Sequence, residues 1–192
     1  ATGRDLTEPM HDFASRYLRE LPEVDGFLLK ARSPSCGIHG VKVFLGETAA
    51  IPAGRDAGKF AVAVMGRFPD HPVEHEGRLT NPRLLDDFLT GLFIIADVRR
   101  ARHQNGSATG LVDLHSRHHL TRIMFSPQDQ NALDRIVEES YSHAEEAWCA
   151  YTEVFRRAWA RAPRQAGHLK VIQYVANHLR ERLSLAEGGQ LN

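Results

Sequence analysis

The spacing of apolar residues changes near Asn81, and this change limits the folds open to the chain. Before it, short apolar runs alternate with helix-like segments, the pattern of an α/β layer. After it, apolar residues recur at three- and four-residue steps, as in amphipathic helices. We therefore predict an α/β fold, a Rossmann-like layer whose N-terminal part is incomplete, followed by an all-α helical domain.

The predicted domain boundaries follow from this change. We expect the α/β part at residues 1–76, a connecting helix and linker at 77–106, and the helical domain at 107–192, incomplete at its C-terminal end. Within the first part, the pattern predicts a helix from Thr7 to Leu21. It also predicts strands at 27–31 and 41–45, a glycine-rich turn at 54–58 that opens a helix at 59–65, and an edge element at 68–74.

The second part is predicted to consist of consecutive helices. One begins at Pro82 and ends at a polar break, 103–107, and the next carries apolar residues from 111 to 124 before Ser126-Pro127. From Tyr141 to Ala158, apolar residues alternate in three- and four-residue steps, which predicts a seam that packs against another helix. A final helix spans 171–183.

Charge and cysteine usage exclude several classes of protein. Lys plus Arg number 24 and Asp plus Glu number 24, so no net charge draws the chain to nucleic acid or an anionic membrane. No apolar run reaches the roughly 20 residues of a spanning helix, and the N-terminus does not read as a signal peptide. Two distant cysteines do not form a disulfide framework. We expect a cytoplasmic protein with neither membrane nor nucleic-acid partner.

Cys36 stands in the segment Lys30–Gly37, directly after an apolar run that predicts a buried strand. In α/β sheets, ligands bind at the carboxyl ends of strands, where this segment would lie. Ser33 and Ser35 place hydroxyls beside the thiol, which suits a metal ligand or a nucleophile. The alternative is a buried structural thiol, because free cysteine is often buried. The residues alone leave both interpretations open.

Three histidines form a second candidate site. On a helix, His115 shares a face with His118 and His119, a spacing that presents two imidazoles to one metal ion. His168, after Gly167, is a candidate further ligand, so the predicted metal-binding set is His115, His118 and His168. The alternative is that these histidines cap helices, form hydrogen bonds or line a helix interface.

The segment 54–59 resembles a phosphate-binding loop only superficially. The Walker pattern needs four residues between its glycines and a Ser or Thr after the lysine. Here the glycines are closer together and Phe60 follows Lys59. We interpret this segment as a glycine-rich turn near a ligand.

The run Leu29–Gly37, which contains Ser-Pro-Ser-Cys-Gly, resembles the hallmark of the thiouracil desulfidase family, long catalogued as a domain of unknown function. Residues 3–7, Gly58 and Phe60-Ala61 fit the same family. The remainder is similar to the helical YbgA-type domain that is often fused behind it. This second similarity rests on residues 72–79, Phe88, 114–118, 126–127 and 167–168.

The resemblance implies a cofactor and a reaction. Family members hold a [4Fe-4S] cluster with three cysteines and leave one iron open to the sulfur of a thiocarbonyl substrate, while water replaces that sulfur at carbon. Cys36 matches the third of these cysteines and is expected to bind cluster iron, and Ser33 matches a catalytic serine that faces the substrate. The other two cysteines of the family precede the position of Ala1. We therefore expect the cluster in a full-length parent, completed by a missing N-terminal segment, and not in this chain alone.

Two functions follow as hypotheses. The first is a fragment of an iron-sulfur-dependent desulfidase that removes sulfur from a small thiolated substrate, such as a thiolated pyrimidine; whether this chain by itself is an enzyme stays open. The alternative is a non-catalytic helical module that binds a partner, ligand or metal. It would use the seam from Tyr141 to Ala158 and the face from His115 to His119.

Overall fold

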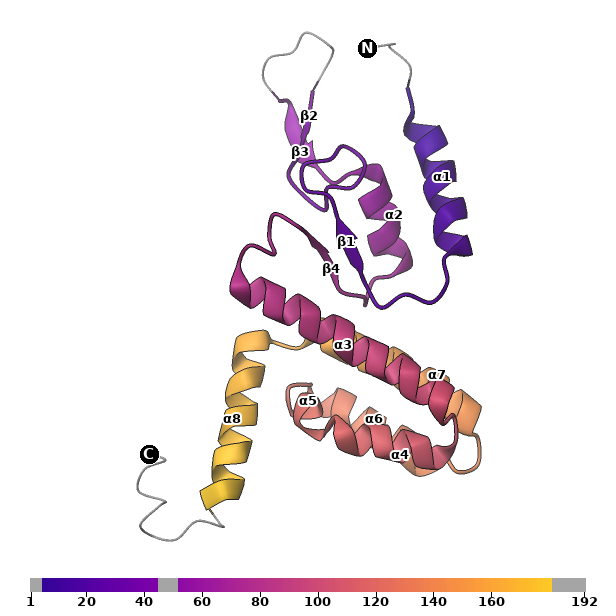
Figure 1. Cartoon of the computed structure of the whole chain (residues 1–192), viewed down its shortest axis with the longest axis vertical. Coiled ribbons are helices and arrows are strands. Elements are labelled where there is room, and N and C mark those ends of the chain that lie inside the picture. Colours follow the sequence, from indigo (N-terminus) through magenta and orange to yellow (C-terminus); the bar gives the residue numbers. More distant parts are fainter. Residues whose placement is uncertain (1–4, 45–51, 181–192) are drawn as a thin grey trace. The chain divides into compact units, whose positions relative to one another are not determined.

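The computed structural model describes residues 5–44 and 52–180 (Figure 1). It divides the chain into two compact units, Ala1–Ile94 (unit 1) and Ile95–Asn192 (unit 2). The boundary between the units falls within one long helix, α3 (Pro82–Gln104). Small sheets occur in the first unit and helices alone make up the described part of the second, so the prediction of an α/β part followed by an all-α part is confirmed.

The described residues of unit 1 form two small sheets and two helices before α3. In chain order its elements are α1 (Thr7–Glu20), β1 (Phe27–Leu29), β2 (Val41–Val43), β3 (Gly54–Asp56), α2 (Lys59–Arg67) and β4 (Val73–His75). β1 pairs with β4 in parallel, with Leu29 opposite His75, and β2 pairs with β3 in antiparallel orientation.

The predicted strands of unit 1 are confirmed in position but are shorter than expected. The strand expected at 41–45 covers Val41–Val43, and Leu45 lies outside the described residues. β3 is a difference from the prediction, because Gly54–Asp56 was expected to form a turn. Val41 and Asp56 are paired across the β2–β3 ladder. The residue types of Gly54–Asp56 do not predict this pairing, because Gly and Asp are uncommon in strands.

The core of unit 1 forms where α1 packs on α2. Ala14 and Leu18 of α1 and Ala61 and Val64 of α2 are buried, and small side chains in this set allow the helices to approach closely. Asp5 stabilises the start of α1, since its Oδ1 accepts a hydrogen bond from the backbone N–H of Thr7 at 2.8 Å.

In its described part, unit 2 continues from α3 through five helices. They are α4 (Ala108–Arg117), α5 (His119–Ile123), α6 (Pro127–Glu139), α7 (Ala144–Arg161) and α8 (Arg164–Arg180). Ser107 and Ser126 cap α4 and α6 by accepting hydrogen bonds from the N–H groups three residues later. The helix expected to contain residues 111–124 is interrupted at His118, which separates α4 from α5.

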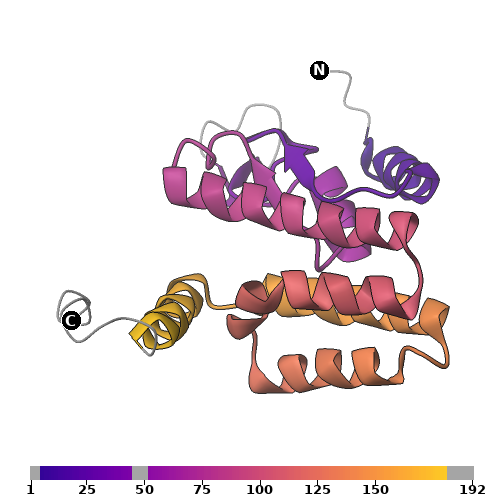
Figure 2. The same ribbon diagram turned by 60° about the horizontal axis from the view of Figure 1, so that its bottom comes forward.

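α7 forms the centre of the unit 2 core and runs beside α6 (Figures 1 and 2). Trp148, Tyr151, Phe155 and Ala158 are buried, which confirms the predicted packing seam over these positions. Tyr141 precedes α7 and is 69% exposed, so it is not part of the seam. Because the unit buries this seam internally, the hypothesis that a partner binds there is wrong. Among the described helices, none combines the length and apolarity required to cross a membrane.

Candidate functional site

Ser33 organises the turn that carries Cys36. Its backbone carbonyl accepts a hydrogen bond from the N–H of Gly37 at 2.9 Å. Its Oγ accepts hydrogen bonds from the N–H groups of Ser35 and Cys36 at 3.3 and 3.2 Å. Ser35 Oγ in turn lies 3.1 Å from Ser33 Oγ and 3.4 Å from Cys36 Sγ. The two hydroxyls and the thiol therefore form one connected group at the end of β1.

The start of α2 holds this turn in place. The N–H of Gly58 donates to the carbonyl of Gly37 at 2.8 Å, and the N–H of Ala61 donates to the carbonyl of Ser35 at 3.1 Å. A Cβ on Gly58 would overlap the backbone of Ser35 and would lie 2.8 Å from the amide nitrogen of Cys36. Gly58 thus permits a backbone contact that a side chain would prevent. The expectation of a glycine-rich turn opening a helix is confirmed at Gly58.

Glu76 fixes the first residues of the same loop. Its carboxylate accepts hydrogen bonds from Lys30 Nζ at 2.6 Å and from the backbone N–H of Ala31 at 2.7 Å. These two donors, Lys30 first, lower the pKa of Glu76 from 4.5 to about 2. Since β1 and β4 are parallel, the loop after Leu29 and the residue after His75 emerge at the same edge.

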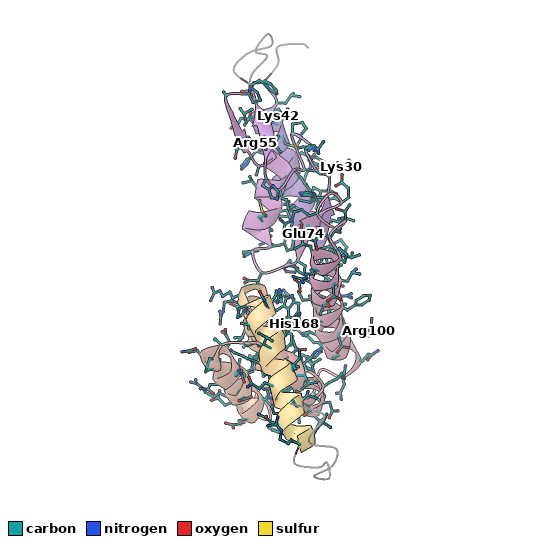
Figure 3. The ribbon with its side chains drawn as sticks, turned by 90° about the vertical axis from the view of Figure 1, so that its left-hand side faces the viewer. Lys30, Lys42, Arg55, Glu74, Arg100 and His168 are labelled. Atoms are coloured by element: carbon teal, nitrogen blue, oxygen red, sulfur yellow. The ribbon has the colours of Figure 1, made fainter. Side chains whose placement is uncertain are left out.

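Two cavities lie beside the loop. The first has a volume of about 690 Å³ and is lined by Arg32, Lys42 and Arg55 among others. Lys42 and Arg55 are opposite one another on β2 and β3, and Figure 3 shows them at the same end of the unit. Pro34 lines this cavity, whereas Ser33 and Cys36 line neither of the two.

The second cavity, of about 600 Å³, shares Arg32 and Arg55 with the first and adds Lys30, His75 and Glu76, whose carboxylate pairs with Lys30. Arg32 has a φ of 58°, a left-handed conformation that is uncommon for a residue other than glycine. This conformation accompanies the reversal of the chain after β1, and the Arg32 side chain lines both cavities. Because Glu76 lines the second cavity, the first, whose charged lining residues among those described are all cations, is the better fit for a small ligand that carries negative charge.

The cysteine content decides whether these residues fit an iron-sulfur cluster. Clusters of this type are held by several cysteine thiolates. Cys36 is the only cysteine in residues 1–76, and Cys149 is in α7 of unit 2. Within 5–44 and 52–180, no group of three or more His, Cys, Asp or Glu side chains is placed to hold a metal ion. The residues of this chain alone therefore do not fit a [4Fe-4S] cluster.

The histidines of the second candidate site lie in unit 2 with separate partners. His115 contacts Asp134 through Nε2 at 3.1 Å and Tyr151 through Nδ1 at 3.3 Å. His118 Nε2 lies 2.9 Å from Asp97, which also pairs with Arg117.

His168 is exposed on α8 (Figure 3). Burial lowers the pKa of both His115 and His118, so these side chains favour the neutral form. The structure does not gather the three side chains at one point, and their role in metal binding stays a prediction.

Several site residues escaped the sequence analysis. Glu76, Lys42 and Arg55 take part through tertiary contacts that no local motif marks. Arg32 stands in the run Leu29–Gly37, but the motif assigns it no role. Cys149, on α7, is exposed and accepts a hydrogen bond from Arg102 at 3.3 Å. The one available signal was the position of Glu76, since it follows the predicted edge element whose carboxyl end meets that of β1.

Comparison with known proteins gives one match. Residues 1–76 match the model of the 2-thiouracil desulfurase family. The resemblance suggested by Ser-Pro-Ser-Cys-Gly is therefore confirmed for this part of the chain, and the helices that follow are consistent with a YbgA-type domain. Searches of curated proteins and of solved structures each found no match.

Proposed function

We propose that residues 1–76, which match the 2-thiouracil desulfurase family, supply part of the active site of a desulfidase. The substrate would be a small thiocarbonyl compound, such as a thiolated pyrimidine. The observation that carries this proposal is the family match over the segment in which Ser33, Ser35 and Cys36 share one hydrogen-bonded turn. Its position after β1 supports the proposal, because ligands bind at the carboxyl ends of parallel strands.

In this proposal, Ser33 orients the substrate by donating a hydrogen bond. Its Oγ already accepts hydrogen bonds from two backbone N–H groups, so the hydroxyl proton is directed toward another acceptor. Ser35 Oγ, at 3.1 Å, is such an acceptor while no substrate is bound. A thiocarbonyl or carbonyl group of the substrate would take its place.

Cys36 is proposed as one thiolate ligand of the cluster that the family resemblance implies. In this proposal the two further thiolates come from a segment outside residues 1–192, because the other cysteine of the chain, Cys149, belongs to unit 2. The hydrogen bonds that Gly58 and Ala61 donate to the turn would keep the backbone of Cys36 in one position. A fixed backbone suits a residue that must bind a cluster iron with its side chain. The proposal is therefore that this chain contributes one ligand and the substrate-facing serine.

Anaerobic reconstitution with iron and sulfide tests the proposal. We expect the chain alone to bind no cluster, and the chain expressed with the residues encoded immediately upstream of Ala1 to bind one and convert 2-thiouracil to uracil. Cys36→Ser should remove the bound iron, whereas His118→Asn should leave it unchanged. Ser33→Ala should keep the iron but lower turnover by about a hundredfold, the usual cost of a lost hydrogen-bond donor to developing charge.

The control for Ser33 is Ser15→Ala, which removes an exposed hydroxyl on α1. A longer protein that binds no iron would contradict the proposed role of Cys36. A longer protein that binds iron but leaves 2-thiouracil and other thiolated pyrimidines unchanged would contradict the proposed reaction.

A further inference from the structure

Asn105 and Gly106 form the turn between α3 and α4. The N–H of Asn105 closes α3 by donating to the carbonyl of Ala101 at 2.8 Å, and Ser107 caps α4. Both residues of the turn are exposed, and Figure 2 shows the chain turning back from α3 into α4 there. Asn105 is the only asparagine in the sequence that precedes a glycine. Because glycine has no Cβ, its amide nitrogen can approach the preceding side chain without steric hindrance.

Two groups of Ser107 donate hydrogen bonds to the side-chain carbonyl of Asn105. The N–H of Ser107 lies 3.3 Å from Asn105 Oδ1, and the Ser107 hydroxyl lies 2.6 Å from the same oxygen. Since the hydroxyl proton of Ser107 is used there, Thr109 Oγ1, at 2.8 Å, donates to Ser107 Oγ. Two donors on one carbonyl oxygen stabilise negative charge that develops on it. They therefore favour attack of a nucleophile on Asn105 Cγ.

The amide nitrogen of Gly106 is the nucleophile that follows directly in the chain, and its bond to Asn105 Cγ would close a five-membered ring. Within the described residues, the N–H of Gly106 donates to no protein acceptor, so solvent can remove its proton. Asn131 and Asn177 differ in this respect. They lie inside α6 and α8, where the N–H groups that follow them form helical hydrogen bonds.

We propose that Asn105 is a site of spontaneous deamidation, which the two donors of Ser107 accelerate. The Gly106 nitrogen forms a bond to Asn105 Cγ and loses its proton to solvent. The bond from Cγ to Nδ2 breaks, and ammonia leaves with the electron pair and a proton. Water then opens the cyclic imide at either carbonyl and gives aspartate or isoaspartate. No atom is oxidised or reduced, and water is the only other reactant. This reaction is independent of the desulfidase proposed for unit 1.

The product alters a turn that contacts the core of unit 2. The carbonyl of Ser107 accepts a hydrogen bond at 3.1 Å from Nε1 of Trp148, which is fully buried. The turn is also closely packed, because a Cβ on Gly110 would overlap the carbonyl oxygen of Asn105. Isoaspartate carries the main chain through its Cβ and Cγ and so lengthens the turn by one atom. We therefore expect unit 2 to lose stability as the protein ages.

Peptide mass spectrometry of the full chain, incubated at neutral pH, tests the proposal. We expect the peptide with Asn105 to gain one mass unit and to separate into aspartate and isoaspartate forms, while the peptides with Asn131 and Asn177 stay unchanged. Ser107→Ala should slow this gain about tenfold, the effect of one lost hydrogen bond on a rate. Ser107→Thr keeps a hydroxyl that can cap α4 and should restore the rate. Aged protein should have a lower urea midpoint, whereas Asn105→Gln aged equally should keep its midpoint.

Deamidation of the unfolded chain separates the effect of the Ser107 hydroxyl from that of the local sequence. In concentrated urea, Ser107→Ala and the unchanged protein should react equally, because the donors are in place only in the folded turn. Ser116→Ala, which removes an exposed hydroxyl on α4, should leave the rate of the folded protein unchanged. A folded Ser107→Ala variant that reacts as fast as the unchanged protein, or faster, would overturn the proposal, since the hydroxyl would then only hold the turn in shape. So would the absence of a mass increase at Asn105, or equal rates at Asn131 and Asn177.

Discussion

Gly58 and Ser35 are in backbone contact, and no side chain fits between them. Through this contact the first turn of α2 supports the loop that carries Ser33 and Cys36. The contact joins two segments that are separated by β2 and β3 in the chain. The position of the loop therefore depends on residue 58 being a glycine.

Gly58→Ala should destabilise unit 1 by about 1–3 kcal/mol, the usual cost of overpacking a close contact. The new Cβ meets the backbone of Ser35 and Cys36, which cannot move aside as a flexible side chain can. Urea unfolding measures the change as a lower midpoint. Gly66→Ala is the matched control, since a Cβ there meets nothing within 4 Å in the described structure and alanine favours the helix. Equal midpoints for both variants would show that the loop yields to the added methyl group.

Glu76 should make the stability of unit 1 depend on pH in acid. Its pKa is about 2 in the folded protein against an ordinary value of 4.5, so the unfolded chain binds a proton more readily. The stabilising effect is complete above pH 4.5 and is lost as the pH falls toward 2. Glu76→Gln should flatten this dependence, as measured by urea midpoints between pH 2 and 6.

The contribution of Glu76 to the free energy of unfolding should be small, because Lys30 is 73% exposed and ion pairs at the surface add little to stability. Glu20→Gln, which removes an exposed carboxylate at the end of α1, serves as the control. The prediction fails if Glu76→Gln and the unchanged protein lose stability in parallel over this range.

His115 should cause a separate loss of stability at milder pH in unit 2. Burial, followed by the nearby Arg122, lowers its pKa from 6.5 to about 4. The unfolded chain therefore takes up a proton between pH 6.5 and 4 that the folded chain does not, so stability falls as the pH is lowered through this window.

His115→Gln should reduce the slope of stability against pH by at most about 1.4 kcal/mol per pH unit, the limit for one proton. Urea unfolding from pH 4 to 7 measures the slope, and an NMR titration of the ring follows His115 directly. His143→Gln, at an exposed position before α7, is the control. A ring that titrates near pH 6.5 in the folded protein would contradict the prediction.

The cationic cavity should favour small ligands that carry a negative charge. Lys42 and Arg55 face each other across β2 and β3 and line the same cavity with Arg32. We expect uridine monophosphate to bind more tightly than uridine, and Lys42→Gln to weaken the nucleotide by about tenfold, as for one charge-assisted hydrogen bond. Calorimetry measures both affinities. Lys59→Gln, outside the cavity lining, should have no effect, and equal affinities for both ligands would rule out an anion-binding role.

The sequence predicted the order of elements well, because apolar spacing reports which face of a helix or strand is buried. Phe155 and Trp148 illustrate this, since both lie on the predicted seam and both are fully buried. Tyr141 has the same spacing but is exposed, because the helix begins only at Ala144. Spacing cannot show where a helix begins when no capping side chain marks the start, and His143 forms no such hydrogen bond.

The candidate site was predicted only in part. Ser33 and Cys36 were singled out because their chemistry is visible in a short motif. No motif indicates a role for Glu76, since that role depends on the parallel pairing of β1 with β4 and on a contact across 45 residues of sequence. β3 was missed for a related reason, as Gly54–Asp56 lacks strand-forming residues and is held by its partner strand.

The contact between Glu76 and Ala31 also has a consequence for folding and for protein engineering. The backbone of the loop after β1 is hydrogen-bonded to Glu76, which follows β4. The loop therefore cannot become fully ordered until the segment between them has folded. Any shortened version of unit 1 must therefore extend through Glu76. A version that stops before it would retain Ser33 and Cys36 but lose the carboxylate that holds the beginning of their loop.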